Sequence, residues 1–364
     1  MSKKNIILCF ILLLKFVLQY ALISTEYDLH RDEYLYLDQA NHLAWGYLSV
    51  PPVTSWFSYI ILLLGKSVFW VRFFSSLFGA LTILIVWKTT ELLGGNLFAL
   101  ILSATAILLS ALLRLNLLYQ PNSIDVLCWA LFYYCLIQFI YSNKDKWLLI
   151  AAVVFAFGFL NKYNVLFMAM GLFPALLITK QRKIFAGKHL YYAAGLALLL
   201  VLPNLVWQYQ NDFPVIYHMQ LLTETQLNNS SRTDFIKEQL IYYLGAFYVL
   251  IAGIISFFLY QPFHKYRVLF WSYVFTLIIF MYFKAKGYYA MGLHPVYFAF
   301  GSVYLEKLLD RKTWVRYLKP VMLLIAIVMF IPLANVAFPV SGPAETEKKA
   351  QSFKDFNLLR WEDG

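Results

Sequence analysis

The sequence predicts an all-α integral membrane protein with about eleven transmembrane helices and a polar site on one membrane face. Of its 364 residues 61% are hydrophobic and 13% are charged, about half the charged fraction of a soluble domain. Apolar stretches long enough to cross about 30 Å of hydrocarbon as a helix recur along the whole chain. The polar residues between these stretches fall mainly in alternate connections, which lie on the same side of a membrane.

The spans can be placed in chain order from the apolar stretches. The first could be read as a signal peptide, but no small-x-small cleavage site follows it, so we interpret it as a retained span. The apolar residues 55–64 are too few to cross and predict a helix at the membrane interface. The predicted spans begin near Ile6, Phe69, Leu97, Ile124, Trp147, Val165, Leu190, Leu240, Val268, Tyr289 and Pro320.

Charge predicts the orientation of these spans. With the N-terminus in the cytoplasm, the inside connections carry most of the Lys and Arg residues, as the positive-inside rule requires. The net charge of +11 is explained in this way, together with contact to anionic lipid, and no nucleic-acid partner is predicted. The three cysteines lie in apolar stretches and show neither a disulfide framework nor a metal motif. We expect one polytopic unit over residues 1–340, with its first outer loop at 24–68, and a short polar tail at 341–364.

Five outer connections contain ionisable or amide side chains. Scattered surface charge would not give this convergence, so we expect a functional site on the outer, extracytoplasmic face. These groups are Asp32 and Glu33 after the first span; Arg114, Asn116, Gln120, Asn122 and Asp125 around the turn after the third; Asn161, Lys162 and Asn164 after the fifth; residues 212–237 after the seventh; and residues 284–294 after the ninth.

The segment 32–52, DEYLYLDQANHLAWGYLSVPP, is the strongest candidate for chemistry. A carboxylate held at the membrane surface costs desolvation energy unless something uses it. The alternative for Asp32 and Glu33 is a helix N-terminus, where acidic residues cap free N–H groups. Asp38 and His42 are four residues apart and would share one face of a helix. This pair could serve a metal ion or a proton relay, although a solvated interfacial pair is the favoured interpretation.

Other ionisable residues at the outer level also have two interpretations. Asp125 lies in the first turn of a span, where it could pair with Arg114, cap the helix or take part in chemistry. The basic candidates could extend to the headgroups or hold a phosphate. The residues that follow Lys286 suggest an irregular turn that lines a cavity. These basic candidates are Lys162, Lys284, Lys286 and, near the outer start of the second span, Arg72.

Five motifs resemble the bacterial polyprenyl-phosphate-dependent glycosyltransferases of the GT-C fold, a group related to protein O-mannosyltransferases and to lipid A aminoarabinose transferases. The most specific is the first outer loop, which is similar to the family pattern D-E-x-Y-Y…H-L-A-W-G-Y…P-P. The resemblance extends over residues from about 30 to 305. The motifs are RDEYLYLDQANHLAWGYLSVPP, LLYQPNSIDVLCWALFYY, GFLNKYNVLF, LPNLVWQYQNDFP and KGYYAMGLHPVYFAFG.

The resemblance implies a GT-C fold in the plasma membrane and transfer of a sugar from a polyprenyl phosphate to an acceptor on the extracytoplasmic face. It implies that Asp32 is the catalytic base and that Glu33 supports or orients it. A second acidic residue is expected near the outer ends of the third and fourth spans. Position favours Asp125, although Asn122 occupies a nearby slot where some relatives have the acid.

The chemistry of this reaction places further requirements on the site. A phosphate leaving group needs cations or a metal more than a proton donor, and a single displacement inverts the anomeric carbon. Asp32, Asp125 and His42 could contribute metal ligands, so a divalent metal ion is left open as a cofactor. The predicted phosphate-binding residues are Lys162, Lys284, Lys286 and Arg72, and the predicted substrate-binding residues are Tyr34, His42, Tyr288 and Tyr289.

Two departures from the family keep alternatives open. Val50 stands where lipid A-modifying relatives have a Lys before the Pro-Pro pair, so another cation must replace it. The tail at 341–364 is shorter than the folded outer portion of many relatives, so the chain is either a minimal version or a truncated one. The acceptor could be a glycolipid, a glycan or a protein. The alternatives to an enzyme using lipid-phosphate-linked sugars are a lipid-linked sugar flippase, a non-catalytic membrane subunit and an O-antigen ligase-like enzyme.

Overall fold

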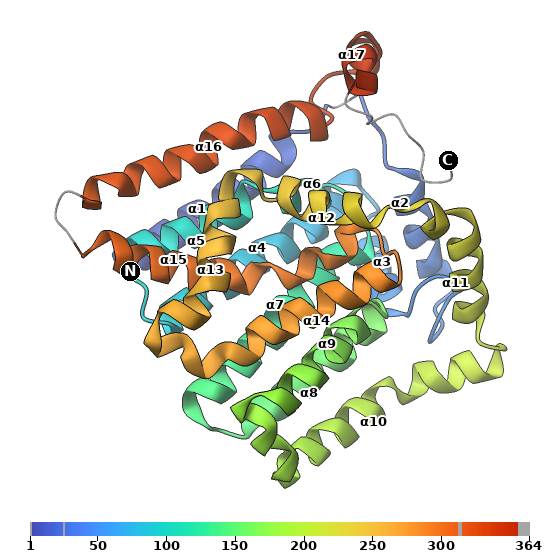
Figure 1. Cartoon of the computed structure of the whole chain (residues 1–364). Coiled ribbons are helices and arrows are strands. Elements are labelled where there is room, and N and C mark those ends of the chain that lie inside the picture. Colours follow the sequence, from blue (N-terminus) through green and yellow to red (C-terminus); the bar gives the residue numbers. More distant parts are fainter. Residues whose placement is uncertain (1, 25, 312–314, 356–364) are drawn as a thin grey trace.

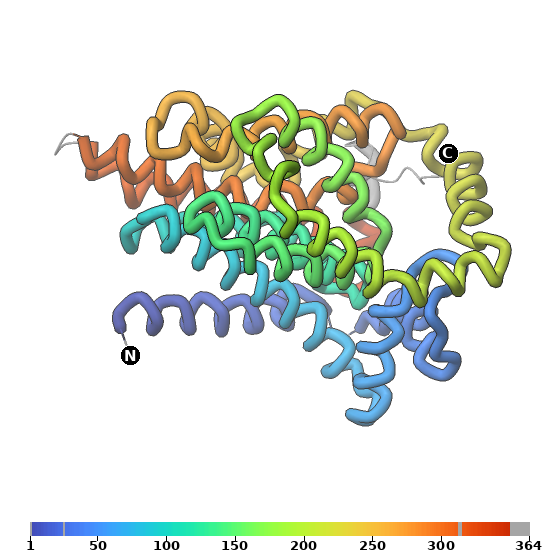
Figure 2. Tube along the Cα trace, turned by 90° about the horizontal axis from the view of Figure 1, so that it is seen from below, coloured from blue at the N-terminus to red at the C-terminus, as the bar shows by residue number. Residues whose placement is uncertain are grey.

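The computed structural model describes residues 2–24, 26–311 and 315–355, and within these ranges it contains helices and no strand. The longer helices run in roughly one direction (Figure 1). The N-terminus lies at one end of this bundle, whereas the first-loop helices and α11 (Pro214–Thr225) lie at the opposite end (Figure 2). The predicted all-α class is therefore confirmed.

A helix occupies each predicted span position. Two helices begin later than expected. After α12 (Arg232–Ile241) the chain bends by 67° before the span proper, and residues 287–293 form the 3-10 helix η6 rather than the start of a span. The span helices are α1 (Lys3–Ala21), α4 (Val68–Leu92), α5 (Leu97–Leu108), α7 (Pro121–Ser142), α8 (Lys146–Asn161), α9 (Val165–Ile178), α10 (Lys188–Gln210), α13 (Phe247–Leu259), α14 (Arg267–Tyr282), α15 (Pro295–Leu309) and α16 (Leu318–Ala337).

Fewer of these helices can cross a membrane alone. In the described part of the chain, five segments have the length and hydropathy of a span: α1, α4, α7, α10 and Val315–Ala337. The number rises to seven if two bent pairs each count as one span, the second being α9 with η2 (Lys180–Ala186), which meet at 103°. The total of about eleven therefore stays a prediction.

Shorter helices complete the two ends of the bundle. The first outer loop contains α2 (Arg31–Asp38), η1 (Gln39–Asn41) and α3 (Val53–Leu63), and α3 confirms the predicted short apolar helix. The tail includes α17 (Pro343–Asp355), where Thr346 is 3.1 Å from the Tyr27 hydroxyl of the first loop. The rest of the predicted tail, 356–364, lies outside the described residues. The remaining short elements are α6 (Ala111–Leu115), η3 (Leu227–Asn229), η4 (Leu244–Ala246), η5 (Gln261–Tyr266) and η7 (Val315–Tyr317).

Close helix contacts at glycine hold the core together. Gly253 on α13 and Gly301 on α15 face the partner helix so closely that a Cβ on Gly301 would overlap the carbonyl oxygen of Val249. Small residues permit this approach of two backbones inside a membrane protein. The neighbouring Tyr297, whose carbonyl oxygen a Cβ on Gly253 would overlap, is fully buried. Space at this contact is therefore limited by main-chain atoms, which cannot move aside as a side chain can.

Substitution at this contact should reveal that limit. Gly301→Ala is expected to lower stability by about 1–3 kcal/mol, because the methyl group overpacks the α13–α15 contact. Gly195→Ala on α10 is the matched control, since a Cβ there meets no atom within 4 Å. Alanine in an open helix position is worth up to about 1 kcal/mol over glycine, so the control should gain stability. Thermal melting in one detergent measures both, and equal shifts of the same sign would contradict the packing.

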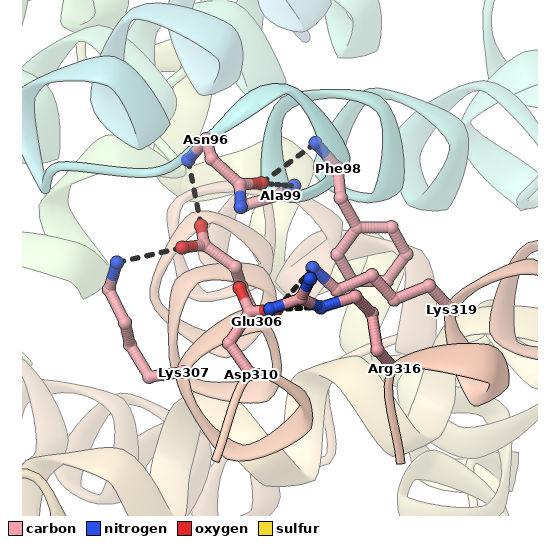
Figure 3. Close-up of polar contacts among 8 residues, drawn as sticks. All are labelled: Asn96, Phe98, Ala99, Glu306, Lys307, Asp310, Arg316 and Lys319. Atoms are coloured by element: carbon pink, nitrogen blue, oxygen red, sulfur yellow. Dashed lines mark hydrogen bonds and ion pairs between the residues drawn. The ribbon is translucent and has the colours of Figure 1, made fainter. Parts of the chain in front are cut away.

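A cluster of charged residues connects three helices at the end of the bundle that lies opposite the first outer loop (Figure 3). Buried Glu306 accepts hydrogen bonds from the backbone N–H of Asn96 and from Lys307, both at 2.7 Å. Asp310 at the end of α15 pairs with Arg316 at 3.2 Å and Lys319 at 2.8 Å. These contacts join the start of α5, the end of α15 and the start of α16.

Candidate active site

The first outer loop begins with a capped helix. His30 is the N-cap of α2: its ring accepts the N–H of Asp32, while Glu33 reaches back to the His30 N–H at 2.7 Å. The other carboxylate oxygen of Glu33 accepts the backbone N–H of Tyr119, also at 2.7 Å. Glu33 is 2% exposed, and each of its carboxylate oxygens accepts a hydrogen bond from a main-chain N–H group. The helix N-terminus interpretation therefore describes Glu33, which fixes α2 against the chain before α7.

Replacement of this carboxylate should loosen the loop. Glu33→Gln leaves one acceptor oxygen where two backbone N–H groups now bind, so one of them, from His30 or Tyr119, becomes unsatisfied. The expected loss of stability is about 1–3 kcal/mol, the cost of an unpaired buried donor. Glu26→Gln in the same loop is the control, because Glu26 is exposed. Equal melting temperatures for the two variants would show that the hydrogen bonds of Glu33 do not contribute this stability.

Asp32 is placed differently from its neighbour. Its side chain is 38% exposed, and Oδ2 accepts a hydrogen bond from Gln120 Nε2 at 2.9 Å. Arg31 Nε lies 3.5 Å from Oδ1, and the ring of His30 is 3.8 Å from Oδ2. The carboxylate is thus oriented by one neutral amide and still accessible. These are the properties that a general base needs.

Two amides connect Asp32 to a half-buried cation, Lys162. Gln120 Oε1 accepts from Asn122 Nδ2 at 2.8 Å, and Asn122 Oδ1 accepts from Lys162 Nζ at 2.7 Å. The residues come from α2, from the start of α7 and from the turn after α8. The structure therefore brings together a carboxylate and an ammonium group that are 130 positions apart (162 − 32) and separates them by two side chains. This row of four is called the polar chain below.

Aromatic rings enclose the lysine at its end. Lys162 Nζ lies 4.4 Å from the ring centre of Tyr289 and 5.3 Å from that of Tyr288, both within cation–π range. Burial lowers the pKa of Lys162 to about 8; Asp125 opposes this shift and Lys286 adds to it. With a pKa of about 8, Lys162 is mainly charged at pH 7 and loses its charge as the pH rises above 8. Of the predicted residues, Asp32, Lys162, Tyr288 and Tyr289 are therefore grouped around one place.

Asp125 supports this group from inside. It is 3% exposed and accepts from Trp129 Nε1 at 3.0 Å and from Asn164 Nδ2 at 2.7 Å. Asn164 also donates to the carbonyl of Tyr289 at 2.9 Å. The alternative partner, Arg114, instead donates to the carbonyl of Ala337 at 2.6 Å. Asp125 therefore fixes the turn that presents Tyr289, and its role as a second acidic catalytic group stays a prediction.

The remaining basic candidates are divided between two places. Lys286 donates to the side chain of Gln226 and Lys284 to the carbonyl of Asn228 at 3.3 Å, so both hold the turn between α11 and α12. Lys286 also acts electrostatically on Lys162. Arg72 donates to the carbonyl of Tyr27 at 3.3 Å and lines a cavity of about 600 Å³ together with Arg31 and Glu33 of the first loop; Lys162 does not line this cavity.

Two first-loop expectations change. α2 ends at Asp38 and a 3-10 turn follows, so the expectation that Asp38 and His42 share a helix face is wrong. His42 is exposed, and its carbonyl accepts from the Tyr47 hydroxyl at 3.0 Å. Tyr34 is also exposed, and its hydrogen bond to Asp28, which is not part of the polar chain, raises its pKa. Among the residues described, no three of His, Cys, Asp and Glu come together as a metal site, so no metal ligands are assigned.

Sequence reasoning did not assign roles to three residues at the site. Gln120 was recognisable only as a polar residue before a span, and Asn122 only as a neighbour of the expected second acid, yet they form the middle of the polar chain. Tyr36 is half-buried; burial raises its pKa, and the neighbouring Asp32 and Tyr289 add to the shift. A helical wheel of α2 places Tyr36 and Tyr34 well apart, which was the available signal.

The helix arrangement is that of a membrane protein of the GT-C fold. Two solved structures show this fold: ArnT from Cupriavidus metallidurans bound to undecaprenyl phosphate, and the oligosaccharyltransferase AglB from Archaeoglobus fulgidus in complex with an inhibitory peptide and a dolichol-phosphate. The TM-scores are 0.65 and 0.60, with 14% and 12% sequence identity. The match covers 86% of this chain for ArnT and all of it for AglB, but 61% of each of those chains.

Sequence comparisons agree with this class. Residues 49–207 match the family model for dolichyl-phosphate-mannose-protein mannosyltransferases. The lipid A galacturonosyltransferase RgtD of Rhizobium johnstonii is 26% identical over 195 residues, which is 53% of this chain and 41% of RgtD. The chain thus spans less than half the length of this curated relative.

Proposed function

We propose that this chain is the membrane unit of an inverting glycosyltransferase that takes a sugar from a polyprenyl phosphate. Transfer occurs at the extracytoplasmic face of the inner membrane, with the N-terminus in the cytoplasm. The observation that carries the proposal is the polar chain, which connects an accessible carboxylate to a half-buried cation through two amide side chains. A carboxylate and a cation are the two groups that this reaction requires.

Each end of the polar chain has one task. The acceptor oxygen attacks the anomeric carbon as the carbon–oxygen bond to the donor phosphate breaks, and the phosphate leaves with the electron pair. Asp32 receives the acceptor proton as the new bond forms. Lys162 stabilises the charge that develops on the phosphate, and Lys286 adds to the local positive potential. A single displacement of this kind inverts the anomeric carbon.

The relatives support the kind of substrate. Undecaprenyl phosphate and dolichol-phosphate are bound in the structures of ArnT and AglB, so a lipid-phosphate donor suits this fold. The acceptor of RgtD is lipid A by its name, and AglB is seen with a peptide. A glycolipid, a glycan or a protein acceptor is compatible with the proposal. Tyr288 and Tyr289 would contact the donor next to Lys162.

Lipid mass spectrometry tests this function. A strain that lacks the gene is compared with the same strain supplied with wild type, Asp32→Asn or Asp28→Asn. A glycosyl polyprenyl phosphate is expected to accumulate without the enzyme and to be cleared by wild type and by Asp28→Asn, but not by Asp32→Asn. If no such lipid accumulates, or if Asp32→Asn clears it as well as wild type, the proposal fails in favour of a flippase or an accessory subunit.

A further inference from the structure

A second cavity lies at the end of the bundle opposite the polar chain. It has a volume of about 760 Å³ and is formed by η2, which follows α9, and by η5, which precedes α14. Four of its lining residues are basic or histidine: Lys180, His264, Lys265 and Arg267. No carboxylate lines it. We call it the basic cavity.

Two packed helices separate the basic cavity from the candidate active site. α9 begins at Val165, directly after Asn164 of the site, and ends at Ile178 in the wall of the cavity. α14 begins at Arg267 in the cavity and returns to Tyr282, just before Lys284. A helix of the length of α9 spans about 21 Å, so the basic cavity is not part of the site around Lys162. Figure 1 shows α9 and α14 side by side.

The cations of the basic cavity are exposed, and two of them, Lys265 and Arg267, have contacts that position them. No ion pair found within the described ranges includes Lys180, Lys265 or Arg267. Lys265 Nζ lies 4.9 Å from the ring centre of Tyr141, and Arg267 Nε donates to the carbonyl of Phe257 at 3.1 Å. Gln181 donates to the carbonyl of Lys265 at 3.1 Å and joins the two walls. The cavity thus presents positive charge that no carboxylate of the described residues pairs with.

One wall of the basic cavity is formed by apolar side chains that are exposed on the surface of the bundle. Ile178 is 57% exposed and Phe258 42%, and both line the cavity together with Trp271. Leu259, next to Phe258, is 65% exposed. Large apolar side chains with this exposure on membrane helices face acyl chains. The cavity therefore combines an exposed apolar wall with basic residues, an arrangement that a soluble anion would not require.

We propose that the basic cavity binds an anionic phospholipid, with its phosphodiester between Lys180, Lys265 and Arg267 and an acyl chain along Phe258 and Trp271. Basic pockets between membrane helices are suited to acidic headgroups, because each Lys or Arg near the surface attracts them. The proposal does not depend on the enzyme activity. It concerns the membrane leaflet opposite the one that contains the polar chain.

Native mass spectrometry of the purified chain, titrated with phosphatidylglycerol or phosphatidylcholine, tests the proposal. Loss of two cations in the variant Lys180→Gln/Lys265→Gln should weaken phosphatidylglycerol binding by about thirtyfold, converted from the typical attraction per Lys. Arg267 is kept because it supports a main-chain carbonyl. Lys144→Gln/Lys188→Gln is the matched control, since these exposed lysines lie at the same end outside the cavity, and its binding should equal wild type.

Three results would overturn the proposal. Equal weakening in the control would show that the lipid is attracted by surface charge in general and not by the cavity. Equal affinity for phosphatidylcholine would show that the charge of the headgroup does not contribute to binding. Inorganic phosphate that binds wild type but not the double variant, while the lipid binds both equally, would assign the cavity to a soluble anion. Trp271→Ala keeps all charges and should weaken the lipid but not inorganic phosphate, which preserves a test if the double variant does not fold. Melting curves of each variant check folding.

Discussion

Asp32→Asn is expected to lower kcat by between about 100-fold and 10,000-fold, because asparagine cannot accept the acceptor proton. Donor affinity should change little, since Asp32 lies at the far end of the polar chain from Lys162. The amide can still bond to Gln120, so the loop should keep its position. Single-turnover transfer and donor binding on the same purified preparation separate the two quantities.

Asp28→Asn is the matched control for this result. Asp28 lies in the same loop and carries the same charge, but it contacts the backbone N–H of Leu29 rather than the polar chain. Its kcat should stay within a few-fold of wild type. A fall in donor affinity for Asp32→Asn as large as its fall in kcat would move Asp32 from proton transfer to donor binding.

Lys162→Met should weaken donor binding by about tenfold to a hundredfold, the value of a charge-assisted hydrogen bond to phosphate. Methionine keeps most of the volume under Tyr289 while it removes the ammonium group. Lys284→Met is the control, because Lys284 donates to the carbonyl of Asn228 and not to the polar chain. Binding of a fluorescent polyprenyl phosphate measures both variants. Equal losses would mean that the phosphate is held by the general potential of the outer face.

The pKa of Lys162 gives this prediction a pH dependence. Because burial lowers that pKa to about 8, the ammonium form is dominant at pH 7 and is reduced to about a tenth at pH 9. Donor affinity should therefore fall as the pH rises through 8 in wild type. Lys162→Arg stays charged throughout, so its affinity should remain flat over this range. A wild-type curve without a fall would show that the bound phosphate raises the pKa beyond the range tested.

The sequence was informative where one local rule decides the outcome. The lengths of the apolar stretches predicted where the helices lie. Because alternate connections lie on the same side of a membrane, they also predicted that Asp32, Lys162 and Tyr289 share one face. It failed where a turn or a packing partner decides. The turn after Asp38 removes His42 from the helix, and Tyr34 is exposed and hydrogen-bonded to Asp28. The roles of Gln120 and Asn122 depend on contacts across 88 and 40 positions, which no local pattern encodes.

The polar chain also has a direction. Lys162 can only donate, so Asn122 must turn its oxygen toward it and its nitrogen toward Gln120, which in turn gives its nitrogen to Asp32. Reversing one amide would set oxygen against oxygen or nitrogen against nitrogen, so the two are locked in the same sense. The dipoles of two uncharged side chains thus distinguish one end of the site from the other. The direction of the polar chain is therefore set before any substrate binds.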